Sequence, residues 1–571
     1  MRIHKYFSLV VFVVFIMIIF IPRISQASEE ILAADSINEK TCTQIGMIAN
    51  DASKDSINYS LLSSELNSGT KILVDDKYYI SGVASNPITI TENIYIEGTT
   101  DNAEFSFTNT YGQKNLFNIQ TKEVIMKKLR FTQLSGGYLY AFNINNVQKL
   151  DNFIIEHCYF EGNIRLLTWS QKVDSQVKFI DPTVSEFGIT HFVFNYNTCR
   201  NLKQFSKGFI YLDDVPISHA ELIGNDIKNF LYAFYTQGIT NENPYRYKIS
   251  EQMKYLEVKD NVVTCDNAWE GSPLLSELYH CFVLFEGNKC DYFNNHVEGL
   301  HVLDQDTAVY DAYLSCWDLD YENNYWKNNI CFYPKKQYGD LMKSKSANKS
   351  TYHGVKRLYK NNTYIVEKSY ADVFKRSYDE LWVSLSYYQR EMDTVIVENN
   401  NFDVYKLGMN YGQPVHNYTF SDNKIHAYAT LESRNNCILP VYRLDNPAPT
   451  DIYTARNNKI IIDTPSAYTE TMNSLIMAVG RKDEVKQVKI IFENNYVEWP
   501  DLLSIISSPL GITPIITNVR IANNTVVATR PGTEKGKTLY TGIYGIYKEF
   551  VFDDNTITIP TNKGYQFKPL I

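Results

Sequence analysis

The sequence lacks the local motifs of several large enzyme classes. No Cys or His spacing resembles a zinc site, no glycine-rich phosphate loop occurs, and no Ser lies in a nucleophile elbow. Gly (26 residues) and Pro (18 residues) are present only at ordinary levels among the 571 residues, which excludes collagen-like and disordered chains. A chemistry carried by a short, recognisable motif is therefore not indicated.

Basic residues are also fewer than acidic residues. The 55 Lys and Arg residues are outnumbered by 64 Asp and Glu residues, which gives a formal charge of -9. An acidic surface argues against a nucleic-acid partner.

A hydrophobic run from Tyr6 to Ile21 follows a basic start and ends at Pro22. This pattern predicts a signal peptide over residues 1–27, cleaved before Ser28, and hence a secreted, periplasmic or cell-surface protein with no stable membrane span after cleavage. An uncleaved anchor is the alternative, because the run is only slightly shorter than a bilayer span. Cleavage would remove three basic residues and no acidic ones, changing the formal charge from -9 to -12.

One local pattern returns throughout the chain: apolar, any, apolar, any, polar, Asn, any, apolar. Such repetition predicts one long solenoid domain over residues 58–571, after a polar lead-in at residues 28–57. The pattern occurs at residues 256–263, 319–326, 395–402, 418–425, 453–460, 490–497, 519–526 and 550–557.

The Asn of this pattern predicts a bend between two short strands, because Asn tolerates the left-handed backbone region and its amide can bond within a turn. Stacked coils would place these amides about 4.8 Å apart, so that they form a structural ladder. The predicted ladder comprises Asn197, Asn225, Asn261, Asn295, Asn324, Asn362, Asn400, Asn423, Asn458, Asn495, Asn524 and Asn555, with Leu129 and Cys158 in the same column earlier in the chain.

Nine Cys residues are present, and several lie at or near the ladder column. We therefore expect buried thiols and few disulfides.

The run of Asn-turn coils, preceded by the segment ITITENIYIEG, resembles the right-handed parallel β-helix of the pectate-lyase-like superfamily. The fold expected is all-β: a single-stranded right-handed parallel β-helix (solenoid) with an Asn-turn ladder. Residues 59–66 have helical spacing and predict a short N-terminal capping helix, and residues 71–74 and 78–80 predict the first strands. The resemblance implies export, an extended glycan substrate and a groove along one sheet.

The longest departures from a minimal coil are the candidate binding segments. Residues 334–357 carry seven basic residues and one acidic residue, which suits a carboxylated or sulfated polysaccharide; a solvated arm is the alternative. Trp382, Tyr387 and Tyr388 follow in the next coil and are candidate sugar-binding residues, although these rings could instead pack beneath loops.

A polysaccharide lyase needs a base and nearby cations, and His353, Lys356 and Arg390 are the candidate catalytic residues. Arg357 is a candidate substrate-binding residue, because it occupies a column that is apolar in most coils.

Acidic pairs offer a competing site, as acid and base of a glycoside hydrolase or as calcium ligands. They are Asp213 with Asp214 (near His219), Asp304 with Asp306, and Asp318 with Asp320. The NTD, DD, GHG and RIK motifs of polygalacturonase-like enzymes do not occur in order, and pairs of Asp residues are also common in turns.

The function predicted is action on, or binding to, an extended acidic polysaccharide, with a lyase reaction as the enzymatic form and calcium as an open candidate cofactor. A noncatalytic glycan-binding or adhesion protein and a hydrolase are the alternatives.

Overall fold

The computed structural model describes most of the strands and turns of the chain. The described residues are 38–108, 112–145, 148–170, 188–202, 208–213, 215–230, 232–236, 255–264, 281–298, 310–327, 356–367, 382–384, 392–404, 406–408, 415–428, 437–441, 451–463, 474–478, 486–500, 502, 504–507, 515–528, 540–543 and 546–558.

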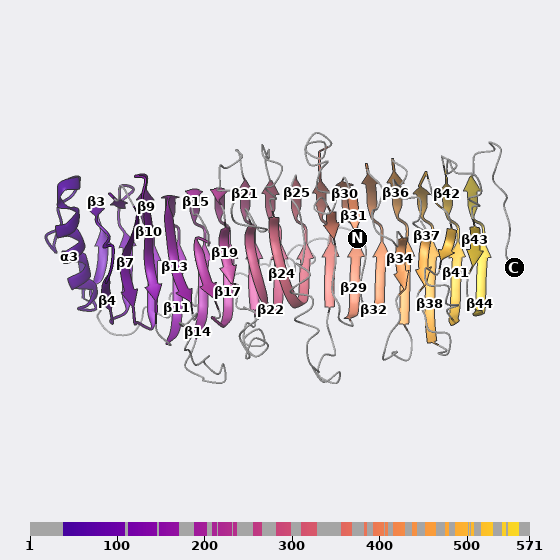
Figure 1. The fold of residues 1–571 in the computed structure, drawn as a ribbon, viewed down its shortest axis with the longest axis horizontal. Coiled ribbons are helices and arrows are strands. Elements are labelled where there is room, and N and C mark those ends of the chain that lie inside the picture. Colours follow the sequence, from indigo (N-terminus) through magenta and orange to yellow (C-terminus); the bar gives the residue numbers. More distant parts are fainter. Residues whose placement is uncertain are drawn as a thin grey trace, which may run out of the picture.

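The described strands form a parallel β-helix (Figure 1), which confirms the predicted solenoid. Every pairing between named strands is parallel, and each coil runs through one strand, a turn and a second strand before it returns. The turns carry a ladder Asn from residue 197 onward. The strands that precede the turns, here called the pre-turn strands, belong to a 23-stranded sheet, the long sheet. They are β2 (Lys71–Val74), β5 (Ile94–Gly98), β8 (Glu123–Lys127), β11 (Lys149–Glu156), β14 (Gly188–Asn195), β17 (Ile217–Ile223), β20 (Tyr255–Lys259), β22 (Cys281–Phe293), β24 (Tyr310–Glu322), β26 (Lys356–Lys360), β29 (Met392–Glu398), β32 (Val415–Ser421), β35 (Asp451–Arg456), β38 (Lys486–Glu493), β41 (Ile515–Ala522) and β44 (Ile546–Asp553).

The other strands complete the walls of the solenoid. The long sheet also contains β1 (Glu39–Thr41), β4 (Ile88–Ile90), β7 (Gln113–Ile119), β10 (Tyr138–Ile144), β13 (Ile164–Ser170), β16 (Ile210–Asp213) and β19 (Tyr232–Thr236). The strands after the turns form a 16-stranded sheet of β3 (Lys77–Ile80), β6 (Glu104–Phe107), β9 (Arg130–Gln133), β12 (Tyr159–Gly162), β15 (Thr198–Leu202), β18 (Asp226–Phe230), β21 (Val262–Thr264), β23 (His296–Glu298), β25 (Tyr325–Lys327), β27 (Thr363–Ile365), β30 (Asn401–Val404), β33 (Lys424–Ala427), β36 (Lys459–Ile462), β39 (Tyr496–Glu498), β42 (Thr525–Val527) and β45 (Thr556–Thr558). Two smaller sheets pair β28 (Trp382–Ser384) with β31 (Lys406–Gly408), and join β34 (Cys437–Val441), β37 (Ser474–Ala478), β40 (Ser504–Ser507) and β43 (Tyr540–Ile543).

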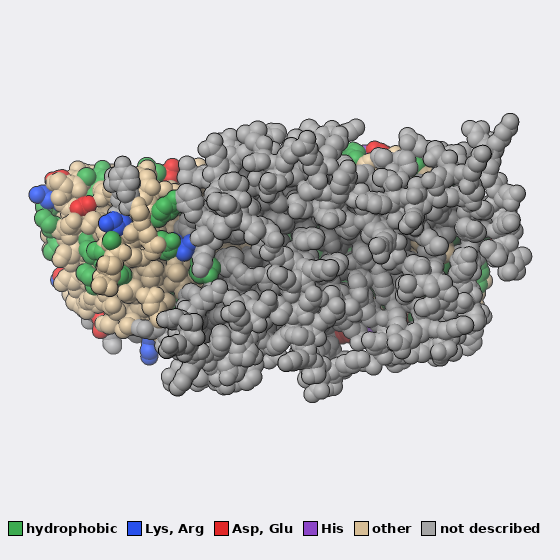
Figure 2. Space-filling model, viewed as in Figure 1, with side chains coloured by type: hydrophobic (Ala, Val, Ile, Leu, Met, Phe, Trp, Pro, Cys, Tyr) green, Lys and Arg blue, Asp and Glu red, His purple; other side chains and the backbone are tan. Residues whose placement is uncertain are grey.

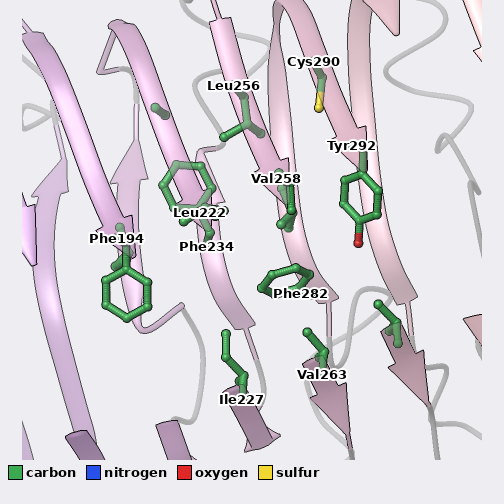
Figure 3. Close-up of a cluster of buried hydrophobic side chains, with 14 of the residues drawn as sticks. Phe194, Leu222, Ile227, Phe234, Leu256, Val258, Val263, Phe282, Cys290 and Tyr292 are labelled. Carbon is green, nitrogen blue, oxygen red and sulfur yellow. The ribbon is translucent and has the colours of Figure 1, made fainter. Parts of the chain in front are cut away.

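The core is built by alternation along each strand. In β20, Leu256 and Val258 are buried while Glu257 between them is not, because successive side chains of a strand point to opposite faces. Side chains from neighbouring coils meet inside the solenoid, as Figure 3 shows for Leu222 of β17, Leu256 and Val258 of β20, and Tyr292 of β22. The inward positions are therefore fixed by packing in every coil, whereas the outward positions are free to carry chemistry.

The predicted Asn ladder is present from Asn197 to Asn555. In the central rungs, the Oδ1 atom of one Asn accepts from the backbone N–H and the side-chain amide of the Asn one coil earlier. Asn362, for example, donates to Asn400 Oδ1 from both its backbone nitrogen and Nδ2, at 2.9 Å each. The second Nδ2 proton of each Asn is directed to a backbone carbonyl of the preceding coil, as for Asn400 Nδ2 and the Tyr359 oxygen at 2.8 Å. These buried amides are structural, as predicted.

The left-handed bend lies one residue before the ladder, which corrects the expectation that the column Asn itself takes this conformation. Asn399 has φ 54° and precedes Asn400, and Tyr196 has φ 57° and precedes Asn197. One residue therefore takes the left-handed conformation, and the Asn that follows it forms the amide ladder.

A short helix, α3 (Asp55–Leu66), lies at the N-terminal end of the solenoid, after the 3-10 turn η1 (Ala52–Lys54) (Figure 1). It buries Tyr59, Leu62 and Leu66 against the first coils, and the Tyr59 hydroxyl donates to the Leu116 carbonyl at 2.8 Å. The predicted capping helix is confirmed and begins four residues earlier than expected. Strand β1 pairs with β2, so the first described strand precedes residue 58.

The four described cysteine side chains, Cys42, Cys158, Cys199 and Cys290, are buried, as expected for inward positions, and Cys42, Cys158 and Cys199 are free thiols. On the N-terminal part of the surface, acidic and basic side chains are interspersed (Figure 2). Several of them are paired across coils, such as Lys71 with Glu97 at 3.2 Å and Lys77 with Glu104 at 2.9 Å.

Within the described ranges, no helix is long and apolar enough to cross a membrane.

Candidate active site

Four acidic residues stand in register on the outward face of consecutive pre-turn strands. Glu221 of β17 pairs with Glu257 of β20, Glu257 pairs with Asp291 of β22, and Asp291 pairs with Asp320 of β24. We call these four residues the acid row. Neighbouring rungs of a sheet are about 4.8 Å apart, so the row extends along the solenoid axis over about 14 Å.

The acid row is local to these coils. The same register position is Val193 in β14 before the row and Leu358 in β26 after it. Behind the row lies the apolar core, where Leu222, Leu256 and Cys290 come from the same strands (Figure 3). The acidic side chains are therefore held on a rigid part of the scaffold.

A second outward column runs beside the acid row, two residues earlier on each strand, and we call it the companion row. It comprises His191, His219, Tyr255, Lys289, Asp318 and Lys356 in successive coils. Proton-transfer groups of several types thus lie next to the acids.

The two rows are joined by short contacts. His219 Nε2 lies 3.1 Å from Glu221 Oε1, and the Asn195 amide donates to Glu221 Oε2 at 3.0 Å. The Tyr255 hydroxyl and the Lys289 ammonium both donate to Asp291 Oδ2, at 2.6 Å and 3.1 Å. These contacts fix the orientation of Glu221 and of Asp291.

The environment separates the pKa values of the first two acids of the row. The contact with His219, followed by the hydrogen bond from Asn195, lowers the pKa of Glu221 despite its burial. Burial raises the pKa of Glu257, and the negative charges of Glu221 and Asp291 raise it further. Adjacent strands therefore present one carboxyl group that ionises more readily than usual beside one that holds its proton to a higher pH than usual.

The other two acids of the row are also perturbed. Asp291 is only 9% exposed, and its Oδ1 atom is buried without a hydrogen-bond partner among the described residues. Burial raises the pKa of Asp320, and the Asp291 charge adds to this effect. Burial, together with the bond to Asp291, raises the pKa of Tyr255, so this phenol stays protonated.

A metal site is not apparent around these groups. Across the described ranges, no group of three or more His, Cys, Asp or Glu residues is arranged to hold a metal ion. The predicted calcium site stays a prediction.

Four of the residues singled out from the sequence belong to the two rows: Asp320 to the acid row, and His219, Asp318 and Lys356 to the companion row. Asp318 and Asp320 are the adjacent members of the two rows on β24, and Lys356 follows Asp318 in the companion row on β26. The Lys356 backbone N–H donates to Asp318 Oδ1 at 2.8 Å, and its side chain is exposed.

Arg357 faces the interior, which corrects its expected role as a substrate-binding residue. The register of β26 is regular, with Arg357 between Leu319 and Val395, and only 3% of Arg357 is exposed. The Tyr359 hydroxyl lies 3.5 Å from its guanidinium group. A side chain in this position cannot contact a glycan on the outer face.

The other predicted residues lie wholly or partly outside the described residues. Trp382 lies in β28, where its backbone pairs with Lys406, but its side chain is not described. His353, Tyr387, Tyr388 and Arg390 fall outside the described ranges, as do Asp214, Asp304 and Asp306.

Lys356 and Arg357 give a paired prediction, because these neighbours point to opposite faces of one strand. Arg357→Ala should cost about 2–5 kcal/mol of stability, as for other large-to-small core substitutions, and leave glycan affinity unchanged. Lys356→Ala should change stability by less than about 0.5 kcal/mol. Urea unfolding and calorimetric glycan titration measure the two effects. A loss of affinity in a stable Arg357→Ala protein would restore the binding role.

Glu221, Glu257 and Asp291 were missed from the sequence, although the repeat contains their signal. Each lies four residues before a ladder Asn, at the outward position between the two apolar residues of the motif. Four successive coils carry an acid there, and the flanking coils carry Val193 and Leu358.

The strand pairing and the acid row define a parallel β-helix protein with carboxyl groups along one outer face. No protein-family model matches the chain, and no curated protein matches it in sequence. Three of the solved structures that are similar to it, all at low identity, illustrate the likeness. They are the Agl-KA catalytic domain (13% identity, 92% of this chain and 69% of that chain covered, TM-score 0.25), the alginate lyase AlyF-OU02 in complex with G6 (10%, 96% and 91%, 0.25) and a PL6 alginate lyase in complex with a trisaccharide (10%, 95% and 90%, 0.21). A likeness at this level carries no argument about function.

Proposed function

We propose that the protein is a glycoside hydrolase that cleaves an extended polysaccharide bound along the acid row. The observation that carries this proposal is the pair of Glu221 and Glu257, two carboxyl groups on adjacent strands whose pKa values move in opposite directions. Glycoside hydrolysis needs one carboxyl group that donates a proton and one that is ionised.

In the proposed reaction, Glu257 gives its proton to the glycosidic oxygen as the bond to the leaving sugar breaks. The Glu221 carboxylate forms a bond to the anomeric carbon on the opposite face. Water then attacks this carbon, Glu257 takes a proton from the water, and Glu221 is released. The two carboxyl groups extend from backbones about 4.8 Å apart, so we expect their separation to be nearer to the roughly 5–5.5 Å of retaining enzymes than to the wider separation of inverting ones, and we expect retention of the anomeric configuration.

The scaffold supports an extended substrate. The acid row follows the axis of the solenoid, so a chain laid on it would meet one rung after another. The basic and apolar leader at residues 1–27 supports a site of action outside the cytoplasm, where such polymers occur.

The decisive experiment incubates the full-length protein with neutral, basic and acidic polysaccharides and measures new reducing ends. Proton NMR of the first product then gives its anomeric configuration. The proposal expects reducing ends without ultraviolet absorbance from unsaturated sugars, and retained configuration. Absence of new reducing ends on every polymer would overturn it.

A polysaccharide lyase is the second candidate, and Lys356 favours it. This exposed cation lies at the end of the companion row, and it belongs to the basic segment of residues 334–357. Elimination on a uronate would give unsaturated products that absorb in the ultraviolet. The acid row opposes this reading, because it repels a polyanion where no cation cluster is described. Binding without turnover would indicate the noncatalytic alternative.

His219 should control the acidic side of the pH profile. Its contact is the largest cause that lowers the pKa of Glu221, so His219→Ala should raise that pKa. Activity requires ionised Glu221, and the acidic limb of kcat/KM should therefore move to higher pH. His191→Ala is the matched control, because His191 contributes least of the causes identified. Equal shifts in both variants would contradict the assignment of Glu221.

A further inference from the structure

Several acids on the long sheet pair with a cation on a neighbouring coil. Lys127 pairs with Glu156 at 2.9 Å, Lys360 with Glu398 at 3.4 Å, and Arg456 with Glu493 at 3.0 Å. The scaffold thus has a regular way of balancing charge on this face.

The acid row departs from this rule. Among the described residues, Lys289 pairs with Asp291 at 3.1 Å, whereas no ion pair with a Lys or Arg is recorded for Glu257 or Asp320. Asp318 and Glu322 add two further carboxyl groups on the outward side of β24. Among the described residues of β22 and β24, acidic side chains therefore outnumber basic ones, although Lys356 and Lys289 lie close enough to Asp320 to offset part of the rise in its pKa that burial causes.

Asp291 supplies an independent indication of a ligand. It is nine-tenths buried, it lies in register between Glu257 and Asp320, and its Oδ1 atom has no hydrogen-bond partner among the described residues. A buried carboxylate oxygen without a donor is costly. A ligand donor on this rung would remove that cost.

We infer that the acid row recognises a polysaccharide whose sugars carry free amino groups, with ammonium groups bound at Asp291 and Asp320. The inference rests on the proposed hydrolase function and names its substrate class. An ammonium group supplies both the positive charge that the row lacks and the donors that Asp291 Oδ1 lacks. The rung spacing of about 4.8 Å is close to the rise of one sugar in an extended pyranose chain, so successive sugars can lie over successive rungs.

The proposed reaction assigns the direction along the row. Glu221 and Glu257 carry the reaction, so the bond that breaks lies over these two rungs, and amino sugars occupy the rungs of Asp291 and Asp320. The sugar at the cleavage position can be N-acetylated or neutral.

The test uses calorimetric titration of the full-length Glu257→Gln protein with glucosamine oligosaccharides and with fully N-acetylated oligosaccharides of the same length. The amino oligosaccharide should bind at least about tenfold more tightly, and added salt should weaken its binding. Adding Asp291→Asn or Asp320→Asn should remove most of this preference, whereas adding Glu398→Gln should not. Asp320→Asn guards against misfolding, because Asp320 is less buried than Asp291.

Equal affinity for the two oligosaccharides, or a preference unchanged by both Asn variants, would overturn the inference. Displacement of the amino oligosaccharide by calcium at equal ionic strength would also overturn it, because the row would then be a metal site. Turnover by the unmodified protein separates the two proposals. If it cleaves neutral or N-acetylated polymers and does not prefer amino sugars, the hydrolase function is supported and the substrate class is overturned. If it binds amino oligosaccharides tightly and releases no new reducing ends, the binding inference is supported and the hydrolase function is overturned.

Discussion

Glu257→Gln is expected to lower kcat on the cleaved polysaccharide by about 10²- to 10⁴-fold, the contribution typical of a general acid. Gln has nearly the same size as Glu and cannot give a proton to the leaving oxygen. Glu257 projects outward from β20 between the inward residues Leu256 and Val258, so the packed core is not altered. Reducing-end release measured at saturating substrate reports this loss.

The pH profile distinguishes this role from a binding role. Glu257 must be protonated, and burial with neighbouring negative charge raises its pKa, so the alkaline limb of kcat in the unmodified protein should report its titration. That limb should disappear from the residual activity of Glu257→Gln. Glu398→Gln is the matched control, because Glu398 also faces outward on a pre-turn strand but pairs with Lys360. Full activity in Glu257→Gln would remove it as the acid.

Most of the scaffold could be predicted because the same physical demand recurs in every coil. Residues 71–74 were predicted as a strand and form β2, and the Asn column from Asn197 to Asn555 forms the ladder. An inward position must be apolar and a buried amide must find partners, whichever coil it occupies. Repetition therefore makes these inward positions recognisable in a single sequence.

The acid row could not be recognised as a unit because its members are neighbours only after folding. The matching ladder residues of these coils are 36, 34 and 29 residues apart, and the acids have the same separations. Asp318 and Asp320 were identified because they lie close together in the chain. Outward positions face no packing demand, so an acid there looks like ordinary surface until the register aligns Glu221, Glu257 and Asp291 with Asp320.

For Arg357, the sequence shows the unusual position but not the direction of the side chain. Arg357 lies in a column that is apolar in most coils, and the strand register does not shift to turn its charge outward. The alternation of β26 is held by Tyr359 inside and by the Asn361 and Asn362 turn that follows. One charged side chain cannot reverse a register that the whole coil specifies, because a one-residue slip would also expose the other inward residues.

The second large effect is expected from the Asn ladder. Asn400→Gly removes the acceptor of two bonds from Asn362 and the donor of bonds to the Tyr359 carbonyl and to Asn423 Oδ1. The Asn362 donors and the Tyr359 carbonyl would be left unsatisfied in the interior. At about 1–3 kcal/mol for each of these three orphaned groups, the loss should reach about 3–9 kcal/mol, a large fraction of the stability of a domain. Urea unfolding followed by tryptophan fluorescence measures it.

Asn399→Gly supplies a control with the same substitution one residue earlier. Asn399 has φ 54°, a conformation that Gly adopts without strain, and its side chain makes an exposed bond to Asn361 Oδ1 at 2.8 Å. Its loss should change stability by no more than about 1 kcal/mol. A similar loss in both variants would mean that the turn conformation, rather than the buried amides, holds the coils together. A large loss in Asn400→Gly alone would assign the cohesion of the solenoid to the ladder.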